Sequence, residues 1–102
     1  MLIKKEVEDR ILENLEIVED NKLAGTNERQ TEKLARYTKN LVELLKGQAG
    51  EFNSAERNII VDNLLDISEI IDKGLSRIPK GLKSKELDIL EMKLNQINKI
   101  TK

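Results

Sequence analysis

Carboxylates are the only side chains in this sequence that could hold a catalytic metal ion. The chain has no histidine, cysteine or tryptophan, and its only aromatic residues are Tyr37 and Phe52. This composition excludes disulfides, thiolate nucleophiles, imidazole bases, zinc sites of the Cys/His type, haem ligation by histidine or cysteine, and iron–sulfur clusters. A di-iron bundle, which needs Glu-x-x-His on two helices, is also excluded. The remaining candidate ion is Mg²⁺, which prefers oxygen ligands.

Two acidic pairs have a spacing that suits Mg²⁺. Glu13 and Glu16 form one Glu-x-x-Glu pair, and Glu69 and Asp72 form a second pair of the same spacing. The pairs resemble the acidic motifs of all-α nucleotide pyrophosphohydrolases, and the resemblance, which extends to no other residue, implies Mg²⁺-dependent nucleotide hydrolysis. At 100° per residue, however, both pairs lie more than about 100° from the apolar stripes of their helices and are expected to face water. We therefore expect no metal, no cofactor and no enzymatic activity.

Hydroxyl nucleophiles are also disfavoured by the sequence. Ser54 and Ser84 stand where helices need an N-cap, and Ser68 and Ser76 lie within a predicted helix. None of them can be activated by a neighbouring histidine, because the chain has none. Capping and packing are the expected roles of these serines.

A basic stripe is the first candidate binding feature. Arg29, Lys33 and Arg36 follow one another at helical spacing on one line, and Tyr37 flanks that line. The stripe is compatible with a solvated face, an acidic protein partner or a nucleic-acid backbone. Three cations are few beside the roughly six to ten phosphate contacts of strong DNA binders. The connection to the next helix, about six residues, is also longer than a helix-turn-helix turn.

Four isoleucines form the second candidate feature, because they lie off the main apolar stripes. Ile59 and Ile70 are eleven residues apart on one line of the third predicted helix, and Ile89 and Ile100 repeat this spacing on the fourth. Either they widen the buried stripe so that it packs against two neighbours, or they form an exposed groove or dimer seam. An acidic outward line on the third helix could also pair with the basic stripe of a second copy: Asp62, Asp66 and Glu69.

The elements that must position these residues are helices. Apolar residues recur at helical spacing in four blocks, and no block alternates in the manner of a strand. Breaks are expected at Gly25, in the loop 47–51 and before Pro79. An unsplit helix running across Gly25 is the alternative to the first break. The predicted helices lie near residues 3–23, 27–46, 54–77 and 84–100.

Caps and apolar stripes support these boundaries. Asn27, Asn53 or Ser54, and Ser84 are the expected N-caps, and Phe52 is expected to close one end of the core. The stripes of the four helices, in chain order, are as follows: Ile3, Val7, Ile11, Leu15 and Val18; Leu34, Thr38, Leu41, Val42 and Leu45; Ile60, Leu64, Ile67, Ile71, Leu75 and Ile78; Leu87, Leu90, Leu94 and Ile97.

Short connections force consecutive helices to run antiparallel, and the net charges of the four blocks alternate in sign. We therefore predict an all-α, single-domain protein over residues 1–102, an up-down-up-down four-helix bundle. The first residues become acidic at once and contain no apolar run of signal-peptide type, and no stretch approaches 18 apolar residues. We expect a cytoplasmic protein that does not enter a membrane.

A helical bundle without catalytic side chains is expected to act by presenting a face to another macromolecule. We expect a protein-binding role of inhibitor, immunity or adaptor type, and the size and helix count are similar to those of small bacteriocin-immunity bundles. The abundance of Lys, Ile and Asn is typical of AT-rich genomes, such as those of low-GC bacteria and their phages. The four isoleucines would anchor a protein partner, and the basic stripe with Tyr37 would select it. The alternatives are a nucleic-acid-binding transcriptional regulator that uses the basic stripe, and a homodimer.

Overall fold

Within residues 2–25 and 28–101, the chain forms four long helices. The computed structural model describes residues 2–25 and 28–101, with side chains described for residues 5–23 and 28–101. The helices are α1 (Leu2–Ala24), α2 (Glu28–Gly47), α3 (Ser54–Ser76) and α4 (Ser84–Thr101), and the short 3-10 turn η1 (Ala49–Glu51) precedes α3. These bounds confirm the four helices predicted from the sequence, and the break after Ala24 rules out an unsplit first helix.

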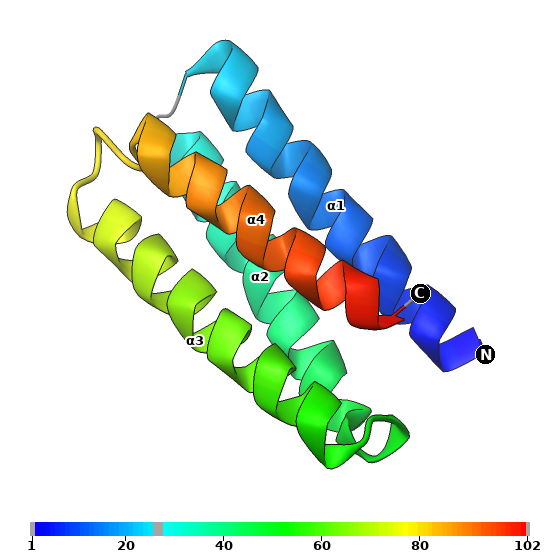
Figure 1. Cartoon of the computed structure of the whole chain (residues 1–102). Coiled ribbons are helices and arrows are strands. Elements are labelled where there is room, and N and C mark those ends of the chain that lie inside the picture. Colours follow the sequence, from blue (N-terminus) through cyan, green and yellow to red (C-terminus); the bar gives the residue numbers. More distant parts are fainter. Residues whose placement is uncertain (1, 26–27, 102) are drawn as a thin grey trace.

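Each helix packs against two others around a ring (Figure 1). The contacting pairs are α1 with α2, α2 with α3, α3 with α4, and α4 with α1. Consecutive helices run antiparallel, so α1 and α3 lie across one diagonal of the bundle and α2 and α4 lie across the other. The molecule measures 39 × 20 × 19 Å, which fits helices of about 23 residues at a rise of 1.5 Å each. The predicted up-down-up-down bundle is confirmed.

Local sequence signals set several of the helix ends. Gly25 has a φ of +78°, the left-handed conformation that the sequence predicted at the end of α1. At the start of α3, the Asn53 side chain accepts a hydrogen bond from the Glu56 backbone N–H at 2.8 Å. The Glu56 carboxylate accepts one from the Asn53 backbone N–H at 3.0 Å, which completes a capping box. The predicted start of α3 is therefore confirmed.

The prediction that Ser84 is the N-cap of α4 is wrong by one residue. Ser84 is the first residue of the helix rather than its N-cap. The preceding residue, Lys83, donates its backbone N–H to the Glu86 carboxylate at 2.8 Å, and its carbonyl accepts from the Leu87 N–H at 3.1 Å. The acidic side chain in the first turn thus binds the N-terminal backbone without a capping hydroxyl. The other predicted cap, Asn27, and the stripe residue Ile3 lie outside the residues whose side chains are described.

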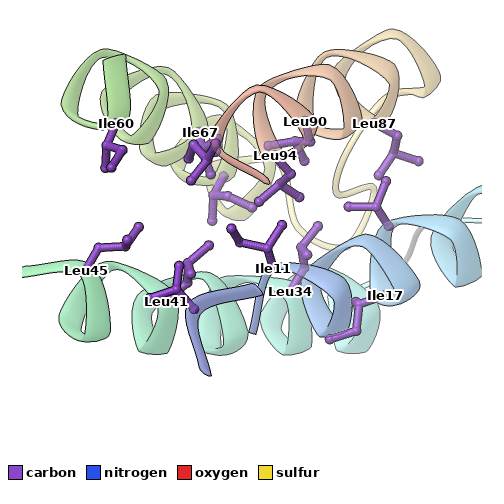
Figure 2. Packing of buried hydrophobic residues seen from close by; sticks show 14 of the residues in the cluster. Ile11, Ile17, Leu34, Leu41, Leu45, Ile60, Ile67, Leu87, Leu90 and Leu94 are labelled. Atoms are coloured by element: carbon purple, nitrogen blue, oxygen red, sulfur yellow. The ribbon is translucent and has the colours of Figure 1, made fainter. Parts of the chain in front are cut away.

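The core consists of residues of the predicted stripes pointing at one another, together with Ile17 and Leu82, which the sequence analysis did not place in a stripe. Figure 2 shows Leu34 and Leu41 of α2 facing Leu90 and Leu94 of α4, with Ile11 of α1 between them. On α3, the stripe residues Ile60, Ile67 and Ile71 are buried, and Leu64 and Leu75 are half-buried. The last predicted stripe residue, Ile78, lies in the turn that follows the helix. Phe52 is buried and belongs to this cluster, as predicted. Burying each such side chain contributes about 1.5–3 kcal/mol.

A buried polar contact fixes how α1 is placed along α2. The Thr38 hydroxyl donates to the Asn14 side-chain oxygen at 3.1 Å, and the Asn14 amide donates to the Arg10 carbonyl at 2.8 Å. Asn21 lies seven residues after Asn14 on α1, and Thr31 lies seven residues before Thr38 on the antiparallel α2. These two residues occupy corresponding positions and are also buried. Sliding the two helices past each other would break the hydrogen bond between Thr38 and Asn14 and leave both groups buried without that partner, so this pair favours one alignment.

In the connection between α3 and α4, the side chain of Leu82 packs closely against the backbone of α3 at Gly74. A Cβ atom on Gly74 would lie 2.6 Å from Leu82 Cδ2 and 2.9 Å from Leu82 Cγ. It would also lie 3.4 Å from Thr31 Cγ2. Leu82 is therefore seated directly on the backbone of α3, beside the first turns of α2. Only glycine leaves room for it, which explains a glycine inside a long helix, where this residue costs about 1 kcal/mol relative to alanine.

Candidate interaction surfaces

The basic stripe of α2 is partly exposed and partly turned toward α1 in the structure, where Lys33 and Arg36 also line a hollow with Arg10 of α1. Arg29 and Arg36 are exposed, whereas Lys33 and Tyr37 are half-buried and turn toward α1. Lys33 and Tyr37 line a depression of about 170 Å³ between α1 and α2, together with three carboxylate side chains of α1 and one apolar residue: Glu13, Glu16, Asp20 and Ile17. The positive charge in the middle of the stripe is thus set beside negative charge from the neighbouring helix.

The four off-stripe isoleucines are brought together at the seam between α3 and α4. Lys93 Nζ lies 2.8 Å from the Asp66 carboxylate, which places these two residues level with each other. Ile59 lies seven residues before Asp66 and Ile100 seven residues after Lys93. Ile70 lies four residues after Asp66 and Ile89 four residues before Lys93. Because α3 and α4 are antiparallel, each isoleucine of α3 has a counterpart at its own level on α4.

The seam is partly closed by these residues themselves. Ile70 and Ile100 are half-buried and pack against the core, whereas Ile59 is 46% exposed and Ile89 is 39% exposed. The Asp66–Lys93 ion pair crosses the middle of the seam. Two of the four side chains therefore serve mainly the core, and two remain accessible.

The two acidic pairs are not assembled into one site. Glu13 and Glu16 face the α2 side of α1, whereas Glu69 and Asp72 lie on α3, across the diagonal of the bundle. Glu69 is instead paired with Lys73 at 3.3 Å on its own helix. Within residues 5–23 and 28–101, no three acidic side chains are grouped so that they could hold a metal ion.

A groove along the α2–α3 seam is the feature that sequence reasoning missed. One end is a pocket of about 130 Å³ with an apolar lining and two cations at its edge: Leu45, Ala49, Phe52, Ile60, Val61 and Leu64; Lys46 and Arg57. Further along the seam is a depression of about 320 Å³. The residues that line it are Ala35, Thr38, Lys39, Val42, Ser68, Ile71, Asp72 and Leu75. The two hollows lie in line because both are formed by α2 and α3.

Small side chains keep this seam open. The α2 side contributes Ala35 and Thr38 where larger residues would fill the space, and α3 contributes Ser68. Beside the groove on α3, Val61 is 51% exposed and Leu65 is 64% exposed. Of the four seams in the bundle, this one has the least extensive contact between helices. The available sequence signal was the pair Val61 and Leu65, which are apolar residues outside the main stripe of α3.

Ion pairs bridge both seams that α4 forms, one with α1 and one with α3. Lys22 of α1 lies 2.9 Å from the Glu91 carboxylate and 3.1 Å from the Asp88 carboxylate of α4. Hydrogen bonds to Glu91 and Asp88 raise the pKa of Lys22 above its ordinary value. These contacts hold α1 against α4, and they place no reactive group in a cleft.

A second bridge stands at the start of α4. Partial burial raises the pKa of the Glu86 carboxyl, but the Lys83 backbone N–H and the Arg77 guanidinium stabilise its ionised form more strongly. The net result is a pKa of Glu86 below its ordinary value. The Glu86 carboxylate therefore ties the connection after α3 to the first turn of α4 as a structural anchor.

Comparison of this chain with protein-family models, with curated proteins and with solved structures finds no match. In the part of the chain that the structure describes, no helix combines the length and the apolar character that a membrane crossing requires.

Proposed function

We propose that this protein is a non-enzymatic helical protein that binds a protein partner, as an inhibitor, an immunity factor or an adaptor. The observation that carries this proposal is the apolar groove between α2 and α3, flanked by the exposed side chains of Val61 and Leu65. Exposed apolar surface that is hollowed and bordered by charged residues is typical of protein interaction sites. We place this binding of a protein partner in the cytoplasm.

The groove supports the proposal better than the isoleucine surface does. At the α3–α4 seam, Ile70 and Ile100 are already packed against the core, and an ion pair crosses the centre. The α2–α3 seam instead offers two hollows in line, into which side chains of a partner can insert. Insertion of apolar anchors into a groove between two helices is a common mode of recognition. Ile59 and Ile89 are then a secondary contact surface.

The alternative of nucleic-acid binding through α2 has less support. Lys33 shares its depression with Glu13, Glu16 and Asp20, which would repel a phosphate backbone. The exposed cations of this face, Arg29 and Arg36 of the stripe and Arg10 of α1, are few for a binding mode that depends on many phosphate contacts.

Photo-crosslinking tests the proposal at defined positions. A photoreactive phenylalanine analogue is placed at Val61 or Leu65, and for comparison at Ile59 or at the exposed Leu12 of α1. Irradiation of cells that make the protein is expected to give one discrete protein adduct from positions 61 and 65. Position 12 should give none, and nuclease treatment should leave the adduct unchanged.

Other outcomes identify other functions. Adducts that contain nucleic acid, or that vanish with nuclease, would contradict the proposal and favour the regulator hypothesis. A discrete protein adduct from position 59 alone would move the binding site to the α3–α4 seam. As a matched test, Val61→Asp with Leu65→Asp should abolish the adduct formed from position 49 in the same groove while the helical circular dichroism signal is retained, because both altered side chains are exposed.

A further inference from the structure

Resting on the proposed function, we propose that the α2–α3 groove receives an acidic amphipathic helix of the partner protein. The apolar side chains of that helix would enter the two hollows, and its carboxylates would meet the basic side chains along the groove. The inference combines the size of the hollows, their linear arrangement and the charges at their edges.

The size and lining of the hollows favour side chains of a larger partner over a small molecule. The apolar pocket is about 130 Å³ and the second hollow about 320 Å³, at or below the roughly 300–1,000 Å³ of typical small-molecule sites. The first pocket is lined by hydrocarbon, with cations only at its edge. Converging polar groups that would orient a small ligand are not part of that lining.

The length of the groove matches a helix. On α3 it extends from Arg57 to Leu75, which at 1.5 Å per residue is about 27 Å, or a helix of about 18 residues. A helix with apolar residues at every third or fourth position presents a row of side chains with that linear arrangement. Two apolar anchors in the hollows would also cover Val61 and Leu65, which the fold leaves exposed.

The charges at the groove select an acidic occupant. Three cations line it, Lys39 and Lys46 from α2 and Arg57 from α3, against a single carboxylate, that of Asp72. Within the described residues, no salt bridge involves any of these three cations.

The two seams that α4 forms show the contrast. Lys22 is bridged to α4 by Asp88 and Glu91, and Lys93 is bridged to α3 by Asp66. At the α2–α3 seam, the corresponding negative charges are left for a partner to supply.

The same charges argue against two other occupants. A second copy that docked through the same groove would bring Lys39, Lys46 and Arg57 of both chains together, because a two-fold interface repeats the same surface. A nucleic acid would satisfy the cations but would leave the apolar floor and Val61 facing a phosphate backbone. An acidic amphipathic helix satisfies both the apolar and the charged parts of the groove.

Two synthetic helical peptides test the inference. Both have about 18 residues and the same row of leucines at helical spacing, and they differ only in carrying glutamates or lysines on either side of that row. The protein is titrated with each peptide, while amide chemical shifts locate the contact and fluorescence anisotropy gives the affinity. The acidic peptide is expected to bind about tenfold more tightly at low salt and to shift amides along α2 and α3, since exposed ion pairs contribute modestly each.

Matched variants separate charge from fold. Lys39→Glu with Lys46→Glu should reverse the preference between the peptides. The same change of net charge on exposed lysines of α4, Lys85→Glu with Lys99→Glu, should leave the preference as it was. Val61→Ser with Leu65→Ser should weaken binding of the acidic peptide at least fivefold.

Each contrary outcome points to a distinct failure. Equal binding of the two peptides in the groove would overturn the acidic partner and leave the proposed function standing. No shift of groove amides with either peptide would also overturn this inference, and the crosslinks from positions 61 and 65 would then decide the proposed function separately. Sedimentation as a dimer with the groove amides protected would show that a second copy is the occupant instead.

Discussion

Replacement of Gly74 by alanine tests whether the contact between Leu82 and α3 is as close as the structure indicates. Inside a helix, this change ordinarily stabilises a protein by about 1 kcal/mol. Here the new methyl group would lie 2.6 Å from Leu82 Cδ2 and 2.9 Å from Leu82 Cγ. Leu82 is only 3% exposed, so it cannot swing freely into solvent.

The magnitude follows from two opposing contributions. Forcing a methyl group into a filled site costs about 1–3 kcal/mol. Because the contact includes Cγ, the branch point of the leucine, we expect the upper part of that range, about 2–3 kcal/mol. After the helix-propensity gain of about 1 kcal/mol is subtracted, Gly74→Ala should lower the free energy of unfolding by about 1–2 kcal/mol.

A matched glycine provides the control. Gly47 is exposed at the end of α2, and a Cβ there would meet no atom within 4 Å. Gly47→Ala should therefore be neutral or stabilising, by up to about 1 kcal/mol. Urea unfolding followed by circular dichroism at constant m-value measures both variants, and a loss of 1 kcal/mol corresponds to a melting temperature lower by about 4–8 °C.

A double variant makes the test specific to Leu82. Leu82→Ala alone should cost about 2–5 kcal/mol, as buried leucine truncations do. In the combined variant with Gly74→Ala, the new methyl group fits the space that Leu82 vacates, so the total loss should be smaller than the sum of the two single losses. If Gly74→Ala were as stable as Gly47→Ala, or if the two losses simply added, the assigned contact would be refuted.

Two further predictions concern buried polar groups. Thr38→Val removes the donor to Asn14 and leaves a buried acceptor without its partner, so it should cost about 1–3 kcal/mol. Thr31→Val removes a buried hydroxyl that has no hydrogen-bond partner among the described residues, so it should be neutral or stabilising. Equal losses from these two isosteric changes in urea unfolding would contradict the assigned hydrogen bonding. Because the pKa of Glu86 is lowered in the folded state, its contribution to stability is present above the ordinary glutamate pKa of about 4.3 and is lost as the pH falls through the lower folded value. Glu86→Gln should therefore lower stability at pH 7 and reduce the acid-induced loss below about pH 4.3; an unchanged pH profile of unfolding would show that this carboxylate is not an anchor.

Much of the fold could be predicted because its signals are local. The helical spacing of Ile60, Ile67 and Ile71 gives a stripe whatever lies opposite it, and the capping box of Asn53 and Glu56 is encoded within four residues. The exception, Ser84, shows the limit of such signals. The Glu86 carboxylate accepts the backbone N–H of Lys83, and the Lys83 carbonyl accepts from Leu87, so the helix begins at Ser84 with Lys83 before it.

The candidate site was harder to predict because it depends on what lies beside each helix. Ile59 and Val61 are both off the main stripe of α3, and the sequence does not distinguish them. In the structure, Ile59 lies on the side of α3 where Asp66 pairs with α4, whereas Val61 lies toward α2 and lines the apolar pocket beside Leu45. Small residues on one helix leave a groove only if the neighbouring helix does not fill the space. That groove therefore cannot be predicted until the neighbouring helix is known.

By itself, the sequence determined the class of the protein, the number and ends of its helices, the identity of most core residues and the chemistries that its side chains exclude. These features depend on spacing along one chain segment and on residue types. The tertiary structure decided which seam of the bundle is bridged by ion pairs and which is left open, and that Leu82 requires glycine at position 74. It also placed Lys33 beside the carboxylates of α1. Such features arise between residues far apart in sequence, since they depend on the distances and angles at which helices pack.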